Sequence, residues 1–352
     1  MPAKDKSRKS SNAVTMHAVA AHAGVSPMTV SNVINGRKVW AATREAVLRS
    51  IEQLNYKPNM AAQALASATT MHVGLMYSSP DSAFVSALLV GALDAATRCR
   101  AQLIIRKSSG TTPEQIADVM RELIHEDGAN ALLLPAPYCE VLSGTDLIKE
   151  FPGIPLVGLC SGSELPDIMS VRIDDFAAAY DITIHLISLG HREIAFIRAA
   201  ASHFISITRC AGYLHALEVS GITPDPNLIV DGDLTFEMGI TATEALLGLK
   251  NRPTAILASN DDTAAAAISV AHRRGIAVPE QLSVAGFDDS PTSTRLWPQL
   301  TTVRQPIVEM TKMAVDILAR QFSNEADAGE MTIYAPYTIV TRGSTGTAPP
   351  CP

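Results

Sequence analysis

From residue 71 onward, short apolar runs alternate with longer segments of helical periodicity, and this alternation constrains the fold more than any other feature. Runs such as 131–135 (ALLLP) and 154–159 (IPLVGL) are almost continuously apolar. Such runs are typical of strands buried on both faces of a parallel sheet, because helices cover both sides of it. The pattern predicts an α/β body built from doubly wound parallel sheets.

The alternation occurs in two sets of similar size, which predicts two lobes with a cleft between them. Ligands of doubly wound sheets bind beyond the carboxyl ends of the strands. In the first set we expect strands at 71–77, 102–106, 131–135 and 154–159 with helices at 84–99 and 113–127. In the second set we expect helices at 176–189, 209–220, 236–249 and 261–275 and strands at 194–198, 228–231, 254–258 and 282–286.

Composition excludes several classes of protein. With 47% hydrophobic and 18% charged residues, the 352-residue chain is neither disordered nor collagen-like. No apolar run approaches the roughly 18 residues of a membrane span, and the basic start leads into no apolar signal core. The five cysteines form no CxxC pair, so we expect reduced thiols in a cytoplasmic protein and no cysteine-based metal site.

Charge is distributed unevenly along the chain. Residues 1–68 carry nine Lys or Arg and three acidic residues, about +6, whereas the remainder carries 19 basic and 32 acidic residues, about −13. A small basic head on a large acidic body indicates nucleic-acid binding, although a solvated basic tail at 1–13, expected to be disordered, accounts for part of it.

The head contains a helix-turn-helix pattern. A helix is predicted from Thr15, with its apolar face repeating every three to four residues, and Gly24 ends it in the left-handed conformation. Ser26 suits the N-cap of a second helix, and Pro27 suits its first turn. Two short helices joined by a tight turn form this motif, with Val19, Val25, Val30 and Val33 as its core. An ordinary helical hairpin is the alternative.

The run VAAHAGVSPMTVSNVING, with a third helix from 43 and the phrase IEQLNYKPN at 51–59, resembles the head of LacI/GalR transcription repressors. Family heads commonly place a capping Ser where this chain has Trp40. The resemblance implies a DNA-binding head at 14–58 and a hinge at 59–71. The resemblance implies that Pro27, Met28 and Asn32 face base edges, and that the Asn32 amide can form hydrogen bonds with adenine. It also implies a set of residues that contact DNA phosphates: Thr15, Thr29, Ser31, Asn35, Arg44 and Lys57.

In the family the hinge folds on DNA and pushes a leucine into the minor groove, where an apolar wedge kinks the duplex. Leu65 occupies the matching position, with Asn59 and Gln63 beside it. A plain linker is the alternative.

The body resembles the family as well, in phrases such as GHREIAFI (190–197), PTAILASNDD (253–262) and SVAGFDD (283–289). Family bodies resemble periplasmic sugar-binding proteins, whose chain crosses between the lobes three times. We expect crossings near 172, 305 and 331. The body is then 72–345, with lobe one at 72–172 and 306–331, lobe two at 173–305 and 332–345, and a disordered tail at 346–352.

Two criteria predict the residues that bind a small effector: a place at the end of a strand, and a match to the positions that family members use for effector contacts. Arginine can fork two hydroxyls or a carboxylate, so a neutral sugar, a sugar acid and a phosphate all remain open. Cys160 stands where several sugar-binding relatives have an acidic residue. The candidates are Tyr77, Phe84, Arg172, Arg209, Asn260, Asp288 and Gln305.

Together these features predict an operator-binding, effector-controlled transcription repressor that forms a homodimer and needs no cofactor or metal. The helix at 84–96 has more apolar surface than one sheet face needs, which suits a partner copy. A sugar receptor without a DNA role is the main alternative. A hydrolase is disfavoured, because the paired carboxylates are adjacent in sequence and no phosphate loop, HExxH or GxSxG motif is present.

Overall fold

The computed structural model of the 352-residue chain describes residues 15–34, 39–54, 56, 70–78, 82–200, 203–325 and 330–350. The side chains of His17, Ser31 and Ile34 also lie outside this description. The chain divides into two units, residues 1–70 and 71–352. No helix in the described part is long and apolar enough to cross a membrane.

The first unit contains three helices: α1 (Met16–Ala23), α2 (Pro27–Ile34) and α3 (Ala41–Gln53). The Thr15 side chain accepts a hydrogen bond from the Ala18 N–H, and α1 ends at Gly24, whose φ of 67° is left-handed. The Ser26 hydroxyl caps α2 by accepting from the Thr29 N–H at 3.2 Å. These are the limits that the sequence predicts for α1 and the start that it predicts for α2.

The three helices pack around a small aliphatic core made of Val19, Val30, Val33 and Val47. Helix α3 begins two residues earlier than expected, at Ala41. Trp40 precedes it without a side-chain cap and is 86% exposed, so it does not pack on the head.

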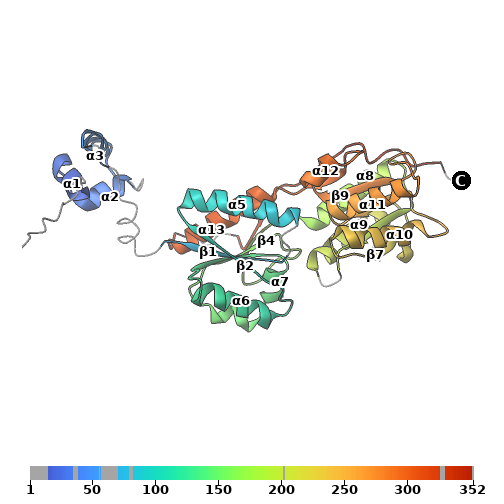
Figure 1. The fold of residues 1–352 in the computed structure, drawn as a ribbon, viewed down its shortest axis with the longest axis horizontal. Helices are drawn as coiled ribbons and strands as arrows, with labels where there is room; N and C mark the ends of the chain where they lie inside the picture. Colours follow the sequence, from blue (N-terminus) through green and yellow to red (C-terminus); the bar gives the residue numbers. More distant parts are fainter. Residues whose placement is uncertain are drawn as a thin grey trace, which may run out of the picture. The chain divides into compact units, whose positions relative to one another are not determined.

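The second unit contains two six-stranded sheets (Figure 1). The first sheet is parallel throughout, and the second is parallel except for its last strand, which is antiparallel to β10. The first sheet has the order β11 (Thr332–Tyr334), β5 (Met169–Arg172), β4 (Leu156–Leu159), β3 (Ala131–Pro135), β1 (His72–Tyr77), β2 (Gln102–Lys107). The second has the order β12 (Thr338–Val340), β10 (Thr301–Arg304), β9 (Ser283–Asp288), β8 (Ala255–Ala258), β6 (Ile194–Arg198), β7 (Ile229–Asp231).

Helices cover both faces of each sheet, as the apolar runs predict. In the first lobe α5 (Ala83–Cys99) and α13 (Ile307–Phe322) pack against one face, and α6 (Pro113–His125) and α7 (Tyr138–Leu142) against the other (Figure 1). In the second lobe α8 and α9 cover one face, and α10 and α11 the other. Their bounds are α8 (Asp175–Ser188), α9 (Phe204–Val219), α10 (Phe236–Leu247), α11 (Asp261–Arg273) and α12 (Pro291–Arg295).

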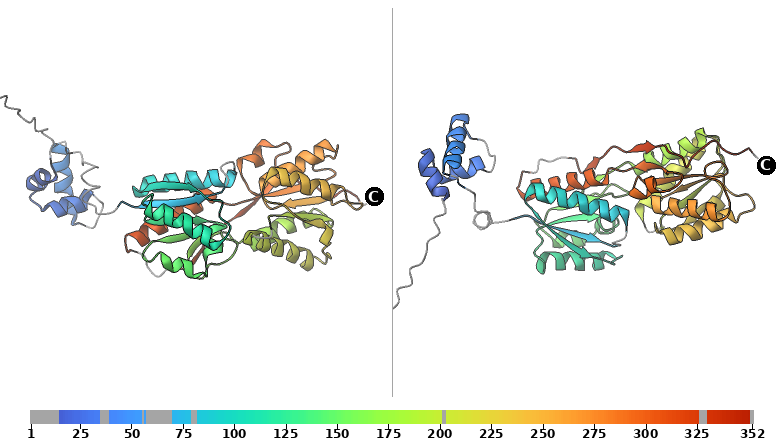
Figure 2. Two further views of the ribbon diagram at one scale, coloured as in Figure 1. Left: turned by 60° about the horizontal axis from the view of Figure 1, so that its bottom comes forward. Right: turned by 45° about the horizontal axis from the view of Figure 1, so that its top comes forward.

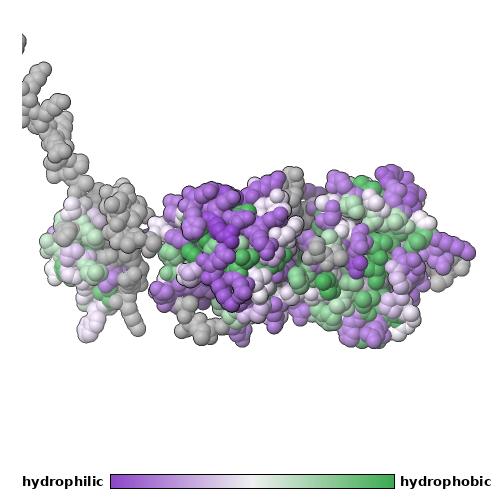
Figure 3. Space-filling view, turned by 90° about the horizontal axis from the view of Figure 1, so that it is seen from below, coloured by the Kyte–Doolittle hydropathy of each residue, from purple (hydrophilic) through white to green (hydrophobic). Residues whose placement is uncertain are grey.

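One hydrophobic core runs through both lobes. It joins the α5 and α13 side of the first sheet to the α8 and α9 side of the second, through residues such as Cys160 and Ile173 between them. The two lobes therefore share buried surface while remaining joined by the linking segments visible in Figure 2. On the side shown in Figure 3 the second lobe exposes more hydrophobic surface than the first.

The predicted third crossing near 331 is wrong. Residues 332–334 form β11 and pair in parallel with β5 of the first sheet, so lobe one extends to Tyr334. The chain then crosses at 335–337 before β12 pairs with β10 in the second sheet. The reason is Pro336, which lacks an N–H and divides the run TIYAPYTIV into two strands of different sheets.

The predicted disordered tail also begins too early. The Gly346 N–H donates to Ser283 Oγ at 3.0 Å, and the Ala348 N–H donates to the Leu189 carbonyl at 2.8 Å. The Gly346 carbonyl lies 3.1 Å from Nε2 of buried His191. Ser283 and His191 are buried, and the chain end satisfies their polar groups, which holds residues 346–348 in place.

DNA-binding head and ligand cleft

In the head, the residues proposed to read bases lie on α2. Met28 is 68% exposed, and Asn32 follows one turn later on the same helix face. Thr29 is half-buried, and its hydroxyl lies 2.9 Å from the Ser26 hydroxyl, so part of its bonding capacity is used locally. Thr15 and Arg44 are exposed. The side chain of Ser31 and the residues Asn35, Lys57, Asn59, Gln63 and Leu65 lie outside the described residues.

In the body, a cleft of about 600 Å³ lies between the lobes at the carboxyl ends of both sheets. It is lined by the segments that follow β1 and β3 in the first lobe and β8, β9 and β10 in the second. In each sheet the strand order reverses beside the first strand, between β1 and β3 and between β6 and β8. Ligands of doubly wound folds bind at such switch points.

Six of the seven proposed effector residues line this cleft: Tyr77, Phe84, Arg209, Asn260, Asp288 and Gln305. The first lobe contributes the two aromatic rings, beside Met76, Pro135 and Tyr138. The second lobe contributes the amides and carboxylates. One wall is thus mainly apolar and aromatic, and the other is rich in hydrogen-bonding groups, an arrangement that suits a ligand with an apolar face and several hydroxyls.

Arg172 is the exception, because it does not line the cleft. It is buried where the chain crosses between lobes, and its Nη2 donates to the Gly162 carbonyl at 2.9 Å while its Nε donates to the Ile173 carbonyl at 3.2 Å. Its guanidinium also lies over the Tyr334 ring, 5.6 Å from the centroid. Its partners Gly162 and Tyr334 belong to the first lobe, so its surroundings indicate a structural arginine at the end of β5.

Arg209 is held rigidly at the base of the cleft. Its Nε donates to Asp175 Oδ1 at 2.8 Å, its Nη1 donates to the Ser259 carbonyl at 2.6 Å, and its guanidinium stacks 3.5 Å from the centroid of Phe287. Both members of the ion pair are almost completely buried. Burial raises the pKa of Asp175, and the positive charge of Arg209 opposes that shift.

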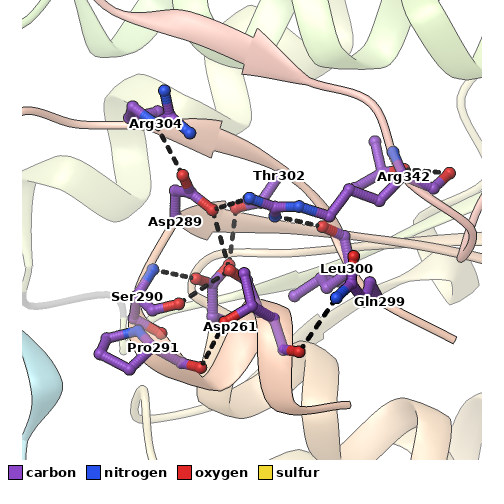
Figure 4. A network of polar contacts seen from close by, with 12 residues as sticks. Asp261, Asp289, Ser290, Pro291, Gln299, Leu300, Thr302, Arg304 and Arg342 are labelled. Atoms are coloured by element: carbon purple, nitrogen blue, oxygen red, sulfur yellow. Dashed lines mark hydrogen bonds and ion pairs between the residues drawn. The ribbon is translucent and has the colours of Figure 1, made fainter. Parts of the chain in front are cut away.

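The carboxylates at the strand ends are bound in a network. Asp261 accepts from Thr302 Oγ1 and from the Ser290 N–H, both at 2.6 Å (Figure 4). Gln305 Nε2 donates to Asp288 Oδ1 at 2.6 Å. Burial raises the pKa of both Asp261 and Asp288, and the negative charge of Asp288 raises that of Asp261 further. Asn260 is also committed in part, since its Oδ1 accepts from Thr263 N to cap α11.

Asp288 and its neighbour Asp289 both have positive φ, at 113° and 55°, which is strained backbone for residues with a Cβ. The Asp289 carboxylate fixes this turn by accepting from Arg304 Nε and Arg342 Nη2, both at 2.6 Å (Figure 4). Burial alone raises the pKa of Asp289, but the hydrogen bonds from Arg342, Arg304 and Ser293 outweigh it and hold the pKa below its usual value. Asp289 therefore positions Asp288.

A contact between the lobes beside the cleft escapes sequence reasoning. The Gly162 carbonyl accepts from Thr208 Oγ1 of the second lobe at 2.7 Å, and the Gly162 N–H donates to Glu140 of the first lobe. A side chain on Gly162 would collide with backbone atoms of Phe204 and Ile205 on α9. The surrounding CSGSEL run reads only as a loop in the sequence, so no local signal distinguishes Gly162.

A helix-turn-helix head joined to a two-lobed body with a polar cleft defines a ligand-responsive DNA-binding regulator. Residues 15–59 match the family model described as bacterial regulatory proteins, lacI family, and residues 183–345 match that of a periplasmic binding protein-like domain. The chain is 33% identical to catabolite control protein A of Priestia megaterium over 334 residues, which covers 94% of this chain and 99% of the relative. The chain belongs to the LacI family.

Other relatives agree. The HTH-type transcriptional regulator GalS of Salmonella typhimurium is 33% identical over 94% of this chain and 96% of its own length. Among solved structures, the lac repressor dimer bound to operator and the anti-inducer ONPF has a TM-score of 0.73 at 27% identity, covering 95% of this chain and all of that one. The structure of the transcriptional regulator CelR with cellobiose has a TM-score of 0.69 at 27% identity, and the match covers 94% of this chain and 99% of that one. The predicted family and fold class are confirmed.

The substitution Gly162→Ala should separate the lobes. The added methyl group cannot fit against the α9 backbone, so the contact with Thr208 must open. We expect a larger radius of gyration of residues 71–352 in small-angle scattering and a lower unfolding temperature. Gly248→Ala, at an exposed helix end with ordinary φ, is the matched control and should change neither. Unchanged scattering in Gly162→Ala would show that the contact does not hold the lobes.

Replacing Glu140 by Gln should change the pH dependence of stability. Burial raises the pKa of Glu140 to about 7, because it favours the protonated carboxyl. The contribution of this carboxyl to the free energy of unfolding is therefore complete below the pKa of the unfolded chain, and it is lost as the pH rises through 7. Gln keeps an oxygen for the Gly162 N–H but does not titrate. Relative to the parent, Glu140→Gln should therefore gain about 2–4 kcal/mol between pH 5 and pH 8 in urea unfolding. Exposed Glu114→Gln is the control, and a parallel pH profile for both variants would refute the assignment.

Proposed function

We propose that this protein binds a palindromic DNA operator as a homodimer and represses transcription, and that a small effector in the cleft controls its operator affinity. The observation that carries the proposal is the combination, in one chain of the LacI family, of the helix-turn-helix head with a cleft built at both switch points. The structure of one relative holds cellobiose, and another is a repressor dimer on its operator. A sugar or sugar derivative is the effector class that these relatives favour.

The mechanism is a shift between two arrangements of the lobes. An effector contacts both walls of the cleft, so it favours the arrangement in which the walls match it. DNA favours the arrangement in which the two hinges of a dimer can meet. The lobes share one continuous core and are joined by the hydrogen bond between Thr208 and Gly162. A change in the cleft therefore moves each lobe as a rigid body and alters the position of one lobe relative to the other.

In the head, we assign base reading to Pro27, Met28 and Asn32. The exposed early part of α2 enters the major groove, where the Asn32 amide can engage adenine and Met28 can contact a thymine methyl. We assign the phosphate contacts to the remaining head residues predicted from the sequence: Thr15, Thr29, Ser31, Asn35, Arg44 and Lys57. For the hinge we keep Leu65 as the minor-groove wedge, with Asn59 and Gln63 beside it.

In the cleft, we assign the hydroxyl contacts of the effector to Arg209, Asn260, Asp288 and Gln305, and the stacking contacts to Tyr77 and Phe84. Arg209 keeps three N–H groups beyond its bonds to Asp175 and Ser259, and these can donate to hydroxyls. Ser259 also lines the cleft, and its carbonyl accepts from Arg209.

We assign the dimer contact to the first lobe. Val90 and Leu93 on α5 are more than half exposed, and they face away from the buried residues Leu88, Gly91 and Ala95 of the same helix. Exposed large aliphatic side chains in the middle of a helix whose other face is buried suit a partner surface. This is the apolar surplus that the sequence indicates.

The relatives matched are transcriptional regulators, and we propose that this chain has no catalytic activity and acts in the cytoplasm. Two members of the adjacent carboxylate pairs 261–262 and 288–289 are engaged in structural bonds: Asp261 with Thr302 and Ser290, and Asp289 with two arginines. In the described part of the chain no group of three potential metal ligands is gathered.

The substitution Asn32→Ala should relax base preference at one position of each operator half-site, at a cost of about 1–3 kcal/mol for the preferred base. Arg44→Ala removes a phosphate contact instead, so it should weaken binding to all sequences and flatten the salt dependence. Binding selection from a random DNA pool with the full chain measures both. An identical selected sequence for the parent and Asn32→Ala would assign base reading to another residue.

Arg209→Ala should abolish the effector response and leave operator binding intact, because each donor lost from a buried polar pocket costs about 1–3 kcal/mol. This variant also leaves Asp175 without its cation, so the double variant Asp175→Asn/Arg209→Met serves as a second test with a neutral interior. Arg98→Ala, which removes an exposed ion pair with Asp316, is the control. Operator release by effector is measured by fluorescence anisotropy, and a normal response in the double variant would remove Arg209 from the effector site.

A further inference from the structure

Helix α9 exposes a stripe of mainly apolar side chains on the outside of the second lobe. Its exposed positions repeat every three or four residues, so they lie on one side of the helix. Ile207 and Val219 are each more than half exposed, and Phe204 is 41% exposed. Water therefore meets large apolar groups along most of the helix. The full stripe consists of Phe204, Ile207, Ala211, His215, Glu218 and Val219.

Three rings continue this surface onto the neighbouring helix α8. The centroid of the His215 ring lies 5.7 Å from those of Phe176 and Tyr180, which both lie on α8. The helices are close together here, because a Cβ on Gly212 of α9 would collide with the Phe176 carbonyl oxygen. We call this continuous surface the α8–α9 face, and its members are Phe176, Tyr180, Phe204, Ile207, Ala211, His215 and Val219.

The charged groups around the α8–α9 face are acidic. The only lysine or arginine within the two helices is Arg209, which is buried in its pair with Asp175. In contrast, Asp181 and Glu218 are exposed on these helices, and Asp174 is exposed at the N-cap of α8. Within the described part of the chain, none of these three carboxylates forms an ion pair with a lysine or an arginine. They would repel nucleic acid or anionic lipid and attract a cationic partner.

A surface hollow adjoins the α8–α9 face where the chain makes its last crossing between the lobes. It is lined by Asp174, by Tyr334 and Tyr337, and by the two residues between these tyrosines. The Tyr334 hydroxyl donates to Glu164 Oε1 at 2.9 Å, and the Tyr337 hydroxyl donates to Asp181 Oδ2 at 2.7 Å. Two tyrosine side chains thus stand among three exposed carboxylates.

The hollow suits a cationic side chain. Carboxylates and the faces of aromatic rings both attract ammonium and guanidinium groups. The buried Arg172 guanidinium already lies over the Tyr334 ring, 5.6 Å from its centroid. One guanidinium against three carboxylates leaves an excess of negative charge for a second cation to balance.

We infer that the α8–α9 face docks a basic, amphipathic segment of another protein. The apolar side of that segment covers Phe176, Ile207 and His215, and one of its lysines or arginines enters the hollow beside Asp174. A second copy of this chain fits less well, because it would place two acidic surfaces against each other. The docking requires neither operator nor effector, so its test does not depend on the proposed function.

The test uses the full chain and three labelled helical peptides of equal length. All three share a leucine face, and the opposite face carries lysine, glutamate or glutamine. In fluorescence anisotropy the lysine peptide should bind saturably and at least about tenfold more tightly than the other two. The inference is overturned if the lysine peptide does not bind, or if the glutamine or glutamate peptide binds equally well.

Two variants test the placement on the α8–α9 face. Ile207→Lys replaces an exposed apolar group by a cation and should weaken binding of the lysine peptide by about tenfold. Asp181→Asn keeps an oxygen that can accept from the Tyr337 hydroxyl but removes the charge, so it should weaken binding by about threefold.

The matched controls make the same replacements on the first lobe. Ile105→Lys changes an exposed isoleucine of β2, and Asp167→Asn changes an exposed carboxylate that accepts from the Ser143 hydroxyl. Neither control should change the affinity for the lysine peptide. Equal losses in the controls and in the α8–α9 variants would show that the peptide responds only to net charge, and would overturn the inference.

Sedimentation equilibrium tests a second copy as the occupant. Ile207→Lys and Ile105→Lys should both have the mass of the parent protein. A lower mass for Ile207→Lys alone would assign the α8–α9 face to a contact between copies of this chain, and would reject docking of another protein.

Discussion

The ion pair between Arg209 and Asp175 is the interaction on which the cleft depends. It joins the first turn of α8 to α9, and through the Ser259 carbonyl it also reaches the end of β8. Burying two charges costs several kcal/mol each, and the pair recovers this only because Phe287 and the carbonyl complete the surroundings of the guanidinium. Such a pair adds little to the free energy of unfolding, but it holds the residues around it in one arrangement. A ligand site needs one fixed arrangement of its residues.

The two lobes are connected in three ways that differ in strength. The chain crosses between them at 173–174, 305–306 and 335–337, which limits their separation without setting an angle. The shared core with Cys160 and Ile173 resists larger movements, because opening it would expose apolar surface. The hydrogen bond of the Gly162 carbonyl to Thr208 is weaker, so it suits a contact that opens and closes. This combination is what a two-state regulator requires.

Backbone strain is concentrated where the cleft needs directed groups. Asp288 and Asp289 keep positive φ because Arg304, Arg342 and Ser293 hold the second carboxylate, and Asp288 lines the cleft beside it. Arg304 lies on β10 directly before a lobe crossing, and Arg342 follows β12. The support of the cleft therefore includes the segments that join the lobes, which gives a physical route from ligand contact to lobe arrangement.

The sequence by itself determined the local elements and the class of protein. Thr15, Gly24 and Ser26 act within a few residues, so the first two head helices were predictable. The apolar runs likewise predicted eight of the strands in the two sheets, but not β5, β10, β11 and β12. Only the tertiary structure decided that Arg172 is withdrawn from the cleft, that Pro336 divides one run between two sheets, and that Gly162 touches α9. These outcomes depend on partners far apart in the chain, whose distances no local pattern encodes.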